Sequence, residues 1–221
     1  MLEWLKQSWK VIVPLLLCAA FGWWWFADGP IHVGADPGPN TRMVILLHGH
    51  GAPKSDLKPL AEELAQGAPN LGFVIPGAPH SVGVNGRTWY PRFTAESKQA
   101  VQQRMAEFRA EARAIVVEIA RDLMADGVPA QQIYVGGFSA GAVLGIDTIL
   151  SPEGSQLGGL IALSGGKMKL DFGPLAERAP LRAFVSHGTR DRLVGAVEFD
   201  GRHEIPMQVR ADLRAFLHDG A

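Results

Sequence analysis

The sequence is poor in cysteine, in net charge and in repeated segments. Its 221 residues include one cysteine, Cys18, which excludes an intramolecular disulfide and a zinc site built from cysteines. The formal net charge of −1 is far from the basic balance of nucleic-acid-binding domains, so we expect no nucleic-acid partner. No internal repeat or low-complexity tract is visible, and the length is enough for one domain with a sizeable core.

The first thirty residues differ in composition from the rest of the chain. Residues 11–26 carry no charge, follow Lys6 and Lys10, and contain or adjoin several tryptophans. Sixteen uncharged residues are marginal for a span, because about 20 residues cover a hydrocarbon core of about 30 Å, although interfacial tryptophans lengthen the effective segment. We predict that residues 1–30 form a single-pass membrane anchor with the folded domain outside the cytoplasm. The alternative is a cleaved signal peptide and a secreted or periplasmic protein.

The remaining chain is predicted to be a short linker and one α/β domain. Residues 31–41 are rich in proline and glycine without periodicity, which predicts a linker before a domain at 42–221. In that domain short apolar runs alternate with segments of helical periodicity, which predicts a mostly parallel sheet with helices on both faces. The predicted strands are 43–47, 72–75, 133–135, 160–163 and 181–185, the predicted helices 55–66, 94–126, 142–150 and 205–218, and the long loop 76–93.

The most informative stretch is Gly137-Phe-Ser-Ala-Gly141, which follows an apolar run and precedes a helical segment. This is the G-x-S-x-G nucleophile elbow in its strand–turn–helix context. Glycine on both sides of Ser139 keeps side chains away from the neighbouring chain where the backbone is strained. The same turn directs the helix N-terminus and the Ala140 N–H at a developing negative charge. We therefore predict that Ser139 is a catalytic nucleophile.

A serine nucleophile needs a histidine base that an acid orients, and in this architecture both follow the serine in sequence. His203 occupies a loop directly before the closing helix, where a base would hang over the sheet. His187 ends an apolar strand and His218 lies at the chain end, so His203 is the preferred base.

The preferred acid is Asp191, which follows the strand 181–185 and a short turn. Asp171, in a loop after the preceding strand, is the second choice, whereas Asp200 is too close to the base in sequence. The predicted catalytic residues are therefore Ser139, His203 and Asp191.

The loop His48-Gly-His-Gly51 ends the first strand and is predicted to complete an oxyanion hole. Such a hole needs two backbone donors, which we assign to the amides of His50 and Ala140. A metal pair formed by His48 and His50 is the rival interpretation, but no acidic or histidine cluster follows, and the two glycines suit a backbone-donor loop better. We predict no metal and no cofactor, and place Gly49 and Gly51 among the substrate-binding residues.

Six short stretches, which include the elbow, occur in the same order along the chain as the motifs of a known enzyme family. They are 47–51 (LHGHG), 85–90 (NGRTWY), 136–141 (GGFSAG), 163–165 (LSG), 187–191 (HGTRD) and 201–203 (GRH). The sequence resembles the phospholipase/carboxylesterase family of α/β-hydrolases, which includes acyl-protein thioesterase-like enzymes and bacterial carboxylesterases. The resemblance implies an α/β-hydrolase fold, the triad Ser139, Asp191 and His203, and an acyl pocket that Trp89 borders. It also implies a small-molecule ester or thioester as substrate, cleaved through an acyl-enzyme on Ser139.

Two features depart from that family. Ala140 stands where many relatives carry Gln, which preserves the amide donor. Only eleven residues separate Asp191 from His203, whereas a parallel crossover needs a dozen or more. We therefore predict a shortened last crossover, a sheet that ends at the strand 181–185, and residues 192–202 as a loop. The alternative function is a non-catalytic or weakly active binding or scaffold protein on a hydrolase fold, because fold alone does not grant activity.

Overall fold

The structure is a computed structural model that describes residues 29–91, 97–165, 181–188, 197–199 and 203–219. The chain divides into two compact units at residue 30, and the second, Ile31–Ala221, contains the described secondary structure.

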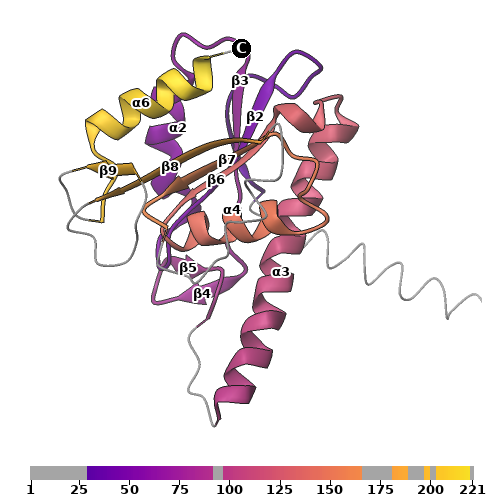
Figure 1. The fold of residues 1–221 in the computed structure, drawn as a ribbon, viewed down its shortest axis with the longest axis vertical. Coiled ribbons are helices and arrows are strands. Elements are labelled where there is room, and N and C mark those ends of the chain that lie inside the picture. Colours follow the sequence, from indigo (N-terminus) through magenta and orange to yellow (C-terminus); the bar gives the residue numbers. More distant parts are fainter. Residues whose placement is uncertain (1–28, 92–96, 166–180, 189–196, 200–202, 220–221) are drawn as a thin grey trace, which may run out of the picture. The chain divides into compact units, whose positions relative to one another are not determined.

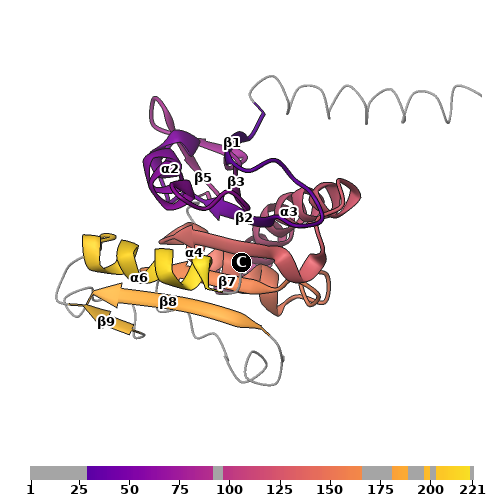
Figure 2. The same cartoon turned by 90° about the horizontal axis from the view of Figure 1, so that it is seen from above.

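Among the described residues seven strands form one sheet in the order β1-β3-β2-β6-β7-β8-β9 (Figures 1 and 2). They are β1 (Ile31–Gly34), β2 (Arg42–Leu47), β3 (Leu71–Ile75), β6 (Ile133–Phe138), β7 (Gly159–Leu163), β8 (Arg182–Gly188) and β9 (Val197–Phe199). All neighbours pair in parallel except β1, which is antiparallel to β3. The hairpin of β4 (His80–Val82) and β5 (Gly86–Thr88) forms a separate two-stranded sheet.

Helices cover both faces of the sheet, as the alternation of elements predicts. They are the short η2 (Lys54–Leu57) and η3 (Ala130–Gln132), and the α-helices α2 (Lys58–Ala65), α3 (Lys98–Ala125), α4 (Ala140–Leu150) and α6 (Met207–His218). Side chains of β2 alternate between two cores, because successive residues of a strand point to opposite faces. Met43, Ile45 and Leu47 pack with α3 and α4, whereas Val44 and Leu46 pack with α2 and α6. The predicted α/β-hydrolase architecture is therefore confirmed.

A buried carboxylate fixes α4 to α3. Asp147 is 5% exposed in the middle of α4 and accepts bonds from the guanidinium groups of Arg109 and, at 3.2 Å, Arg113 on α3. The bond to Asp147 also raises the pKa of Arg109. Because α4 begins directly after the elbow, this ion pair holds the helix that directly follows the predicted nucleophile.

The sheet extends further than predicted at its N-terminal edge. Residues 31–34, assigned above to a linker, form β1 and pair with Gly72–Ile75 of β3. Ile31 and Val33 pack against the core while His32 and Gly34 are exposed, the alternation of a half-buried strand. Four residues are too few for this alternation to stand out from the proline- and glycine-rich residues that follow.

The prediction that the sheet ends at residues 181–185 was wrong. Val197, Glu198 and Phe199 pair in parallel with Ser186, His187 and Gly188 of β8 (Figure 2). The last crossover is short, as predicted, but a strand still follows it. The strand fits because β9 lies beside the carboxyl end of β8 only. The chain has to return by about 7 Å, two residues of strand at about 3.3 Å each, rather than to the opposite end of the sheet.

The predicted transmembrane anchor and the membrane-anchored location are corrected as well. No helix in the described part of the chain combines the length and the apolar character needed to cross a bilayer. Residues 11–26 themselves lie outside that part. Their sixteen uncharged residues are fewer than the about 20 that cover a hydrocarbon core.

Candidate active site

Ser139 lies in the sharp turn between β6 and α4, as the elbow pattern predicts. Its backbone adopts φ 55° and ψ −116°, a conformation that non-glycine residues rarely take. The Ser139 N–H donates to the carbonyl of Leu163 at 2.9 Å, which ties the turn to the end of β7. Among the described residues, Ser139 and Ser164 are the two non-glycine residues with a positive φ, and strain held by the surrounding structure is typical of a functional position.

The flanking glycines are required by close approach of the backbone. A Cβ at Gly137 would lie 2.6 Å from the Leu47 carbonyl oxygen. A Cβ at Gly141 would overlap the same oxygen and lie 2.7 Å from the carbonyl oxygen of His48. The first turn of α4 therefore packs directly on the carboxyl end of β2, where the predicted oxyanion loop begins.

The loop His48–Gly51 lies against the elbow. A Cβ at Gly49 would sit 3.6 Å from the Ser139 Cβ and 3.3 Å from the ring of Phe138, so the loop backbone passes close to both. Ala140 is the first residue of α4, where backbone N–H groups have no intrahelical acceptor. The structure thus brings Gly49, Ser139 and Ala140 close together, and the assignment of the oxyanion donors to the His50 and Ala140 amides stays a prediction.

His203 comes to the same place from a distant part of the chain. Its ring lies 4.8 Å from that of Phe138, centroid to centroid, and Phe138 directly precedes the predicted nucleophile. Ser164, fully buried after β7, donates from Oγ to the Glu204 carbonyl at 3.4 Å and so holds the residue after His203. His203, the predicted base, and Glu204 are therefore held between the elbow and the end of β7.

The two histidines that were not chosen as the base have other places in the fold, and the candidate acids lie outside the described residues. His187 is buried within β8, and Nε2 of His218 bonds to the carbonyl of Leu64 at 3.2 Å, which occupies it with α2. Asp191 and Asp171, the two predicted acids, lie outside the described residues, as does Asp200.

The residues between β3 and α3 support the oxyanion loop through Trp89. Trp89 is fully buried, and its Nε1–H donates to the carbonyl of His48 at 2.9 Å. Its ring also packs on the His48 imidazole, with centroids 5.2 Å apart. The resemblance implied a residue that borders an acyl pocket; the contacts of Trp89 in the described residues are those of a packed support.

His48 uses both ring nitrogens within the loop. Nε2 accepts the Ala78 N–H at 3.1 Å, so Nδ1 carries the proton that goes to the Gly49 carbonyl at 2.8 Å. Burial lowers the pKa of His48 below its ordinary value, which favours this neutral form. Since both nitrogens are committed, the imidazole has no lone pair to offer a metal, which argues against the metal-pair interpretation of His48 and His50.

The depressed pKa of His48 predicts a loss of stability in acid. Below about 6.5, the ordinary pKa, the unfolded chain binds a proton that the folded protein resists, so the free energy of unfolding falls as pH decreases toward the folded pKa. Urea titrations at pH 7.5, 6.5 and 5.5 should show this fall in the wild type. His48→Gln, which does not titrate, should show a smaller fall, and an identical pH dependence in both proteins would contradict the prediction.

Sequence reasoning missed three residues that the site uses. Phe138 carries the His203 ring, Ser164 holds the Glu204 carbonyl, and Thr88 contacts His50. Ser164 and Thr88 lie within stretches that carried the resemblance, so their positions were visible. Their roles were not, because each contact joins residues 38 to 65 positions apart in the chain.

Comparison with known proteins agrees with this geometry. The sequence profile of the phospholipase/carboxylesterase family matches residues 31–207. Acyl-protein thioesterase 1 homolog 1 of Dictyostelium discoideum is 30% identical over 174 residues, which cover 73% of this chain and 75% of that protein. The crystal structure of esterase PE8 superimposes with a TM-score of 0.63 at 25% identity, covering 86% of this chain and 97% of that one.

A carboxylesterase from Mesorhizobium loti shares the fold, with a TM-score of 0.63 at 20% identity over 86% of this chain and 94% of that one. The profile match covers most of the chain and includes the elbow, the oxyanion loop and His203. The chain belongs to the phospholipase/carboxylesterase family of α/β-hydrolases and is a serine hydrolase of the esterase or thioesterase type.

Proposed function

We propose that the protein hydrolyses small carboxylic esters or thioesters through an acyl-enzyme on Ser139. The observation that carries the proposal is the meeting of three segments at one point. Ser139 stands in the strained elbow, the backbone of Gly49 passes so close that a Cβ there would lie 3.6 Å from the Ser139 Cβ, and the His203 ring lies over the adjacent Phe138.

The first half of the proposed reaction forms the acyl-enzyme. Nε2 of His203 takes the hydroxyl proton as Ser139 Oγ attacks the substrate carbonyl carbon. The amides of His50 and Ala140 stabilise the charge on the tetrahedral oxygen. As the carbon–oxygen or carbon–sulfur bond to the leaving group breaks, His203 returns the proton to that group, which departs as an alcohol or thiol.

The second half repeats the sequence with water. His203 removes a proton from a water molecule that attacks the acyl carbon, and then donates it to Ser139 Oγ as the carboxylic acid leaves. Asp191 is the proposed acid that orients the imidazole and stabilises its charged form. Its sequence position supports the assignment, because it follows the carboxyl end of β8 by three residues and precedes β9. None of these steps requires a cofactor.

A fluorophosphonate probe tests the proposal, because such probes phosphonylate activated serines. The folded wild type should be labelled at Ser139, and Ser139→Ala should not react. Ser155→Ala is the matched control, since Ser155 is an exposed serine whose hydroxyl bonds to the Pro152 carbonyl at 2.6 Å, and it should be labelled like the wild type. A folded wild type that resists the probe would instead support a non-catalytic binding protein.

A further inference from the structure

We propose that Thr88 is a positioning residue for the oxyanion hole, through a hydrogen bond that holds the side chain of His50. The inference rests on the proposed function, in which the His50 amide is one of the two oxyanion donors. The Thr88 hydroxyl lies 2.7 Å from Nδ1 of His50, across 38 residues of sequence. Nothing in the elbow pattern or in the loop motif assigns a role to this threonine.

The oxyanion loop depends on contacts with neighbouring segments because two of its residues are glycines, which have few conformational restrictions of their own. His50 stands between Gly49 and Gly51, and Gly51 adopts φ 79°, a region that residues with a side chain rarely enter. The direction of the His50 N–H depends on the torsions of these glycines. His50 carries the only side chain of this tripeptide, and another segment of the chain can bind it.

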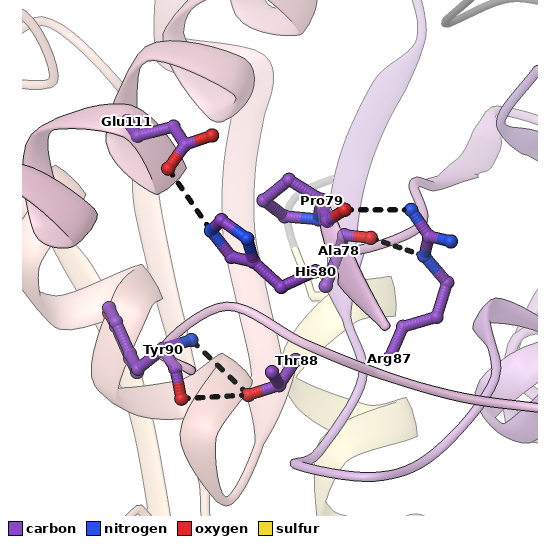
Figure 3. A network of polar contacts seen from close by, with 7 residues as sticks. All are labelled: Ala78, Pro79, His80, Arg87, Thr88, Tyr90 and Glu111. Carbon is purple, nitrogen blue, oxygen red and sulfur yellow. Dashed lines mark hydrogen bonds and ion pairs between the residues drawn. The ribbon is translucent and has the colours of Figure 1, made fainter. Parts of the chain in front are cut away.

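Thr88 is suited to bind the His50 imidazole because other hydrogen bonds fix the position of its own hydroxyl. The residue is fully buried, and its Oγ1 donates to the Tyr90 carbonyl at 3.1 Å and accepts the Tyr90 N–H at 3.2 Å (Figure 3). A hydroxyl has one proton and can accept two bonds. With its proton on the Tyr90 carbonyl, Thr88 accepts from Nδ1–H of His50, which sets the position of the imidazole.

The segment that carries Thr88 is itself firmly attached to the loop. The Gly51 N–H donates to the Arg87 carbonyl at 2.9 Å, and the Arg87 N–H donates to the Ala52 carbonyl at 3.2 Å. The Arg87 guanidinium in turn binds the carbonyls of Ala78 and Pro79 (Figure 3). The β4–β5 hairpin thus supports the oxyanion loop through backbone hydrogen bonds.

The β4–β5 hairpin is in turn attached to the main core of the domain. His80 at the start of β4 contacts Glu111 of α3 at 3.1 Å, which joins the hairpin to a helix of the main core (Figure 3). Burial is the main cause that raises the pKa of the Tyr90 hydroxyl, and the nearby carboxylate of Asp147 raises it further. The Tyr90 side chain therefore stays neutral. A rigid hairpin can therefore fix a loop whose glycines cannot fix themselves.

The consequence is kinetic, because an oxyanion donor acts in the transition state rather than on bound substrate. Thr88→Val keeps the size of the side chain and removes the hydroxyl. We expect kcat for a p-nitrophenyl ester to fall by about 10- to 100-fold, with KM within about twofold of the wild type. Thr88→Ser restores the hydroxyl and should restore kcat. An alkylboronic acid, which becomes tetrahedral on the nucleophile, should lose affinity for Thr88→Val by a factor similar to the fall in kcat.

Two further variants separate positioning from packing. Thr148→Val is the matched control, because Thr148 is equally buried but lies at the far end of α4, and its kcat should be unchanged. His50→Ala keeps the backbone amide and removes the imidazole that bonds to Thr88, so it should lower kcat as Thr88→Val does. The variant with both substitutions should be little worse than either single one. An unchanged kcat in folded Thr88→Val, or an equal fall in Thr148→Val or Thr88→Ser, would overturn the inference. Full turnover in Ser139→Ala would instead overturn the proposed function on which it rests.

Discussion

Replacing Ser139 or His203 by alanine is expected to lower kcat for a p-nitrophenyl ester by about 10³-fold or more. Without the Ser139 hydroxyl no acyl-enzyme forms, and without His203 the hydroxyl keeps its proton at the moment of attack. The double variant should be little worse than either single one, because members of a triad act as a unit. Steady-state rates of the four proteins at one pH give the comparison directly.

The acid is tested in the same assay. Asp191→Asn should lower kcat less than the alanine substitutions at Ser139 and His203, since asparagine can still orient the imidazole but cannot balance its charge. Asp171→Asn should leave kcat near the wild-type value. If Asp171→Asn proves the damaging change and Asp191→Asn does not, the role of the acid moves to Asp171.

Gly141→Ala is expected to have the second largest effect, and to act through the backbone rather than through chemistry. The added methyl would overlap the Leu47 carbonyl oxygen and press on that of His48, so α4 and the oxyanion loop must move apart. We expect a loss of about 3 kcal/mol or more in the free energy of unfolding, because the clash is with backbone at a buried position. Esterase activity of the folded fraction should fall as well, since the same movement displaces the Ala140 amide and the loop.

Gly145→Ala is the matched control for that substitution. Gly145 lies one helical turn later in α4, where a Cβ would meet its nearest neighbours at 3.6 Å, an ordinary contact. Alanine is the better helix former by about 1 kcal/mol, so this variant should be as stable as the wild type or more so. Urea titrations of the three proteins measure the difference, and equal stability of Gly141→Ala and Gly145→Ala would contradict the argument.

The sequence was sufficient for the parts of the fold that rest on local pattern. The apolar run of β2, the long periodic helix α3 and the elbow around Ser139 each carry their signal within a few neighbouring residues. For the base, the order of triad residues in this architecture leaves few histidines to choose from, and the choice of His203 stays a prediction.

Sequence reasoning missed β9 and the β4–β5 hairpin. β9 looked impossible only because a crossover was assumed to return to the far end of the sheet, whereas its pairing with Ser186–Gly188 needs a short return. Residues 76–93, predicted as a loop, contain the β4–β5 hairpin. The three-residue strands of that hairpin are too short for an alternation of apolar and polar residues to identify them.

The order of strands implies that the proposed nucleophile and the proposed base lose their native positions at different denaturant concentrations. β6, which presents Ser139, is the fourth of seven strands and is paired on both sides, so its amide hydrogens should exchange with deuterium only when the whole domain opens. His203 follows β9, the three-residue strand at the rim of the same sheet. Partial opening of that rim would release the proposed base while the proposed nucleophile stays in place, so hydrolysis should cease at a denaturant concentration at which the centre of the sheet is still protected.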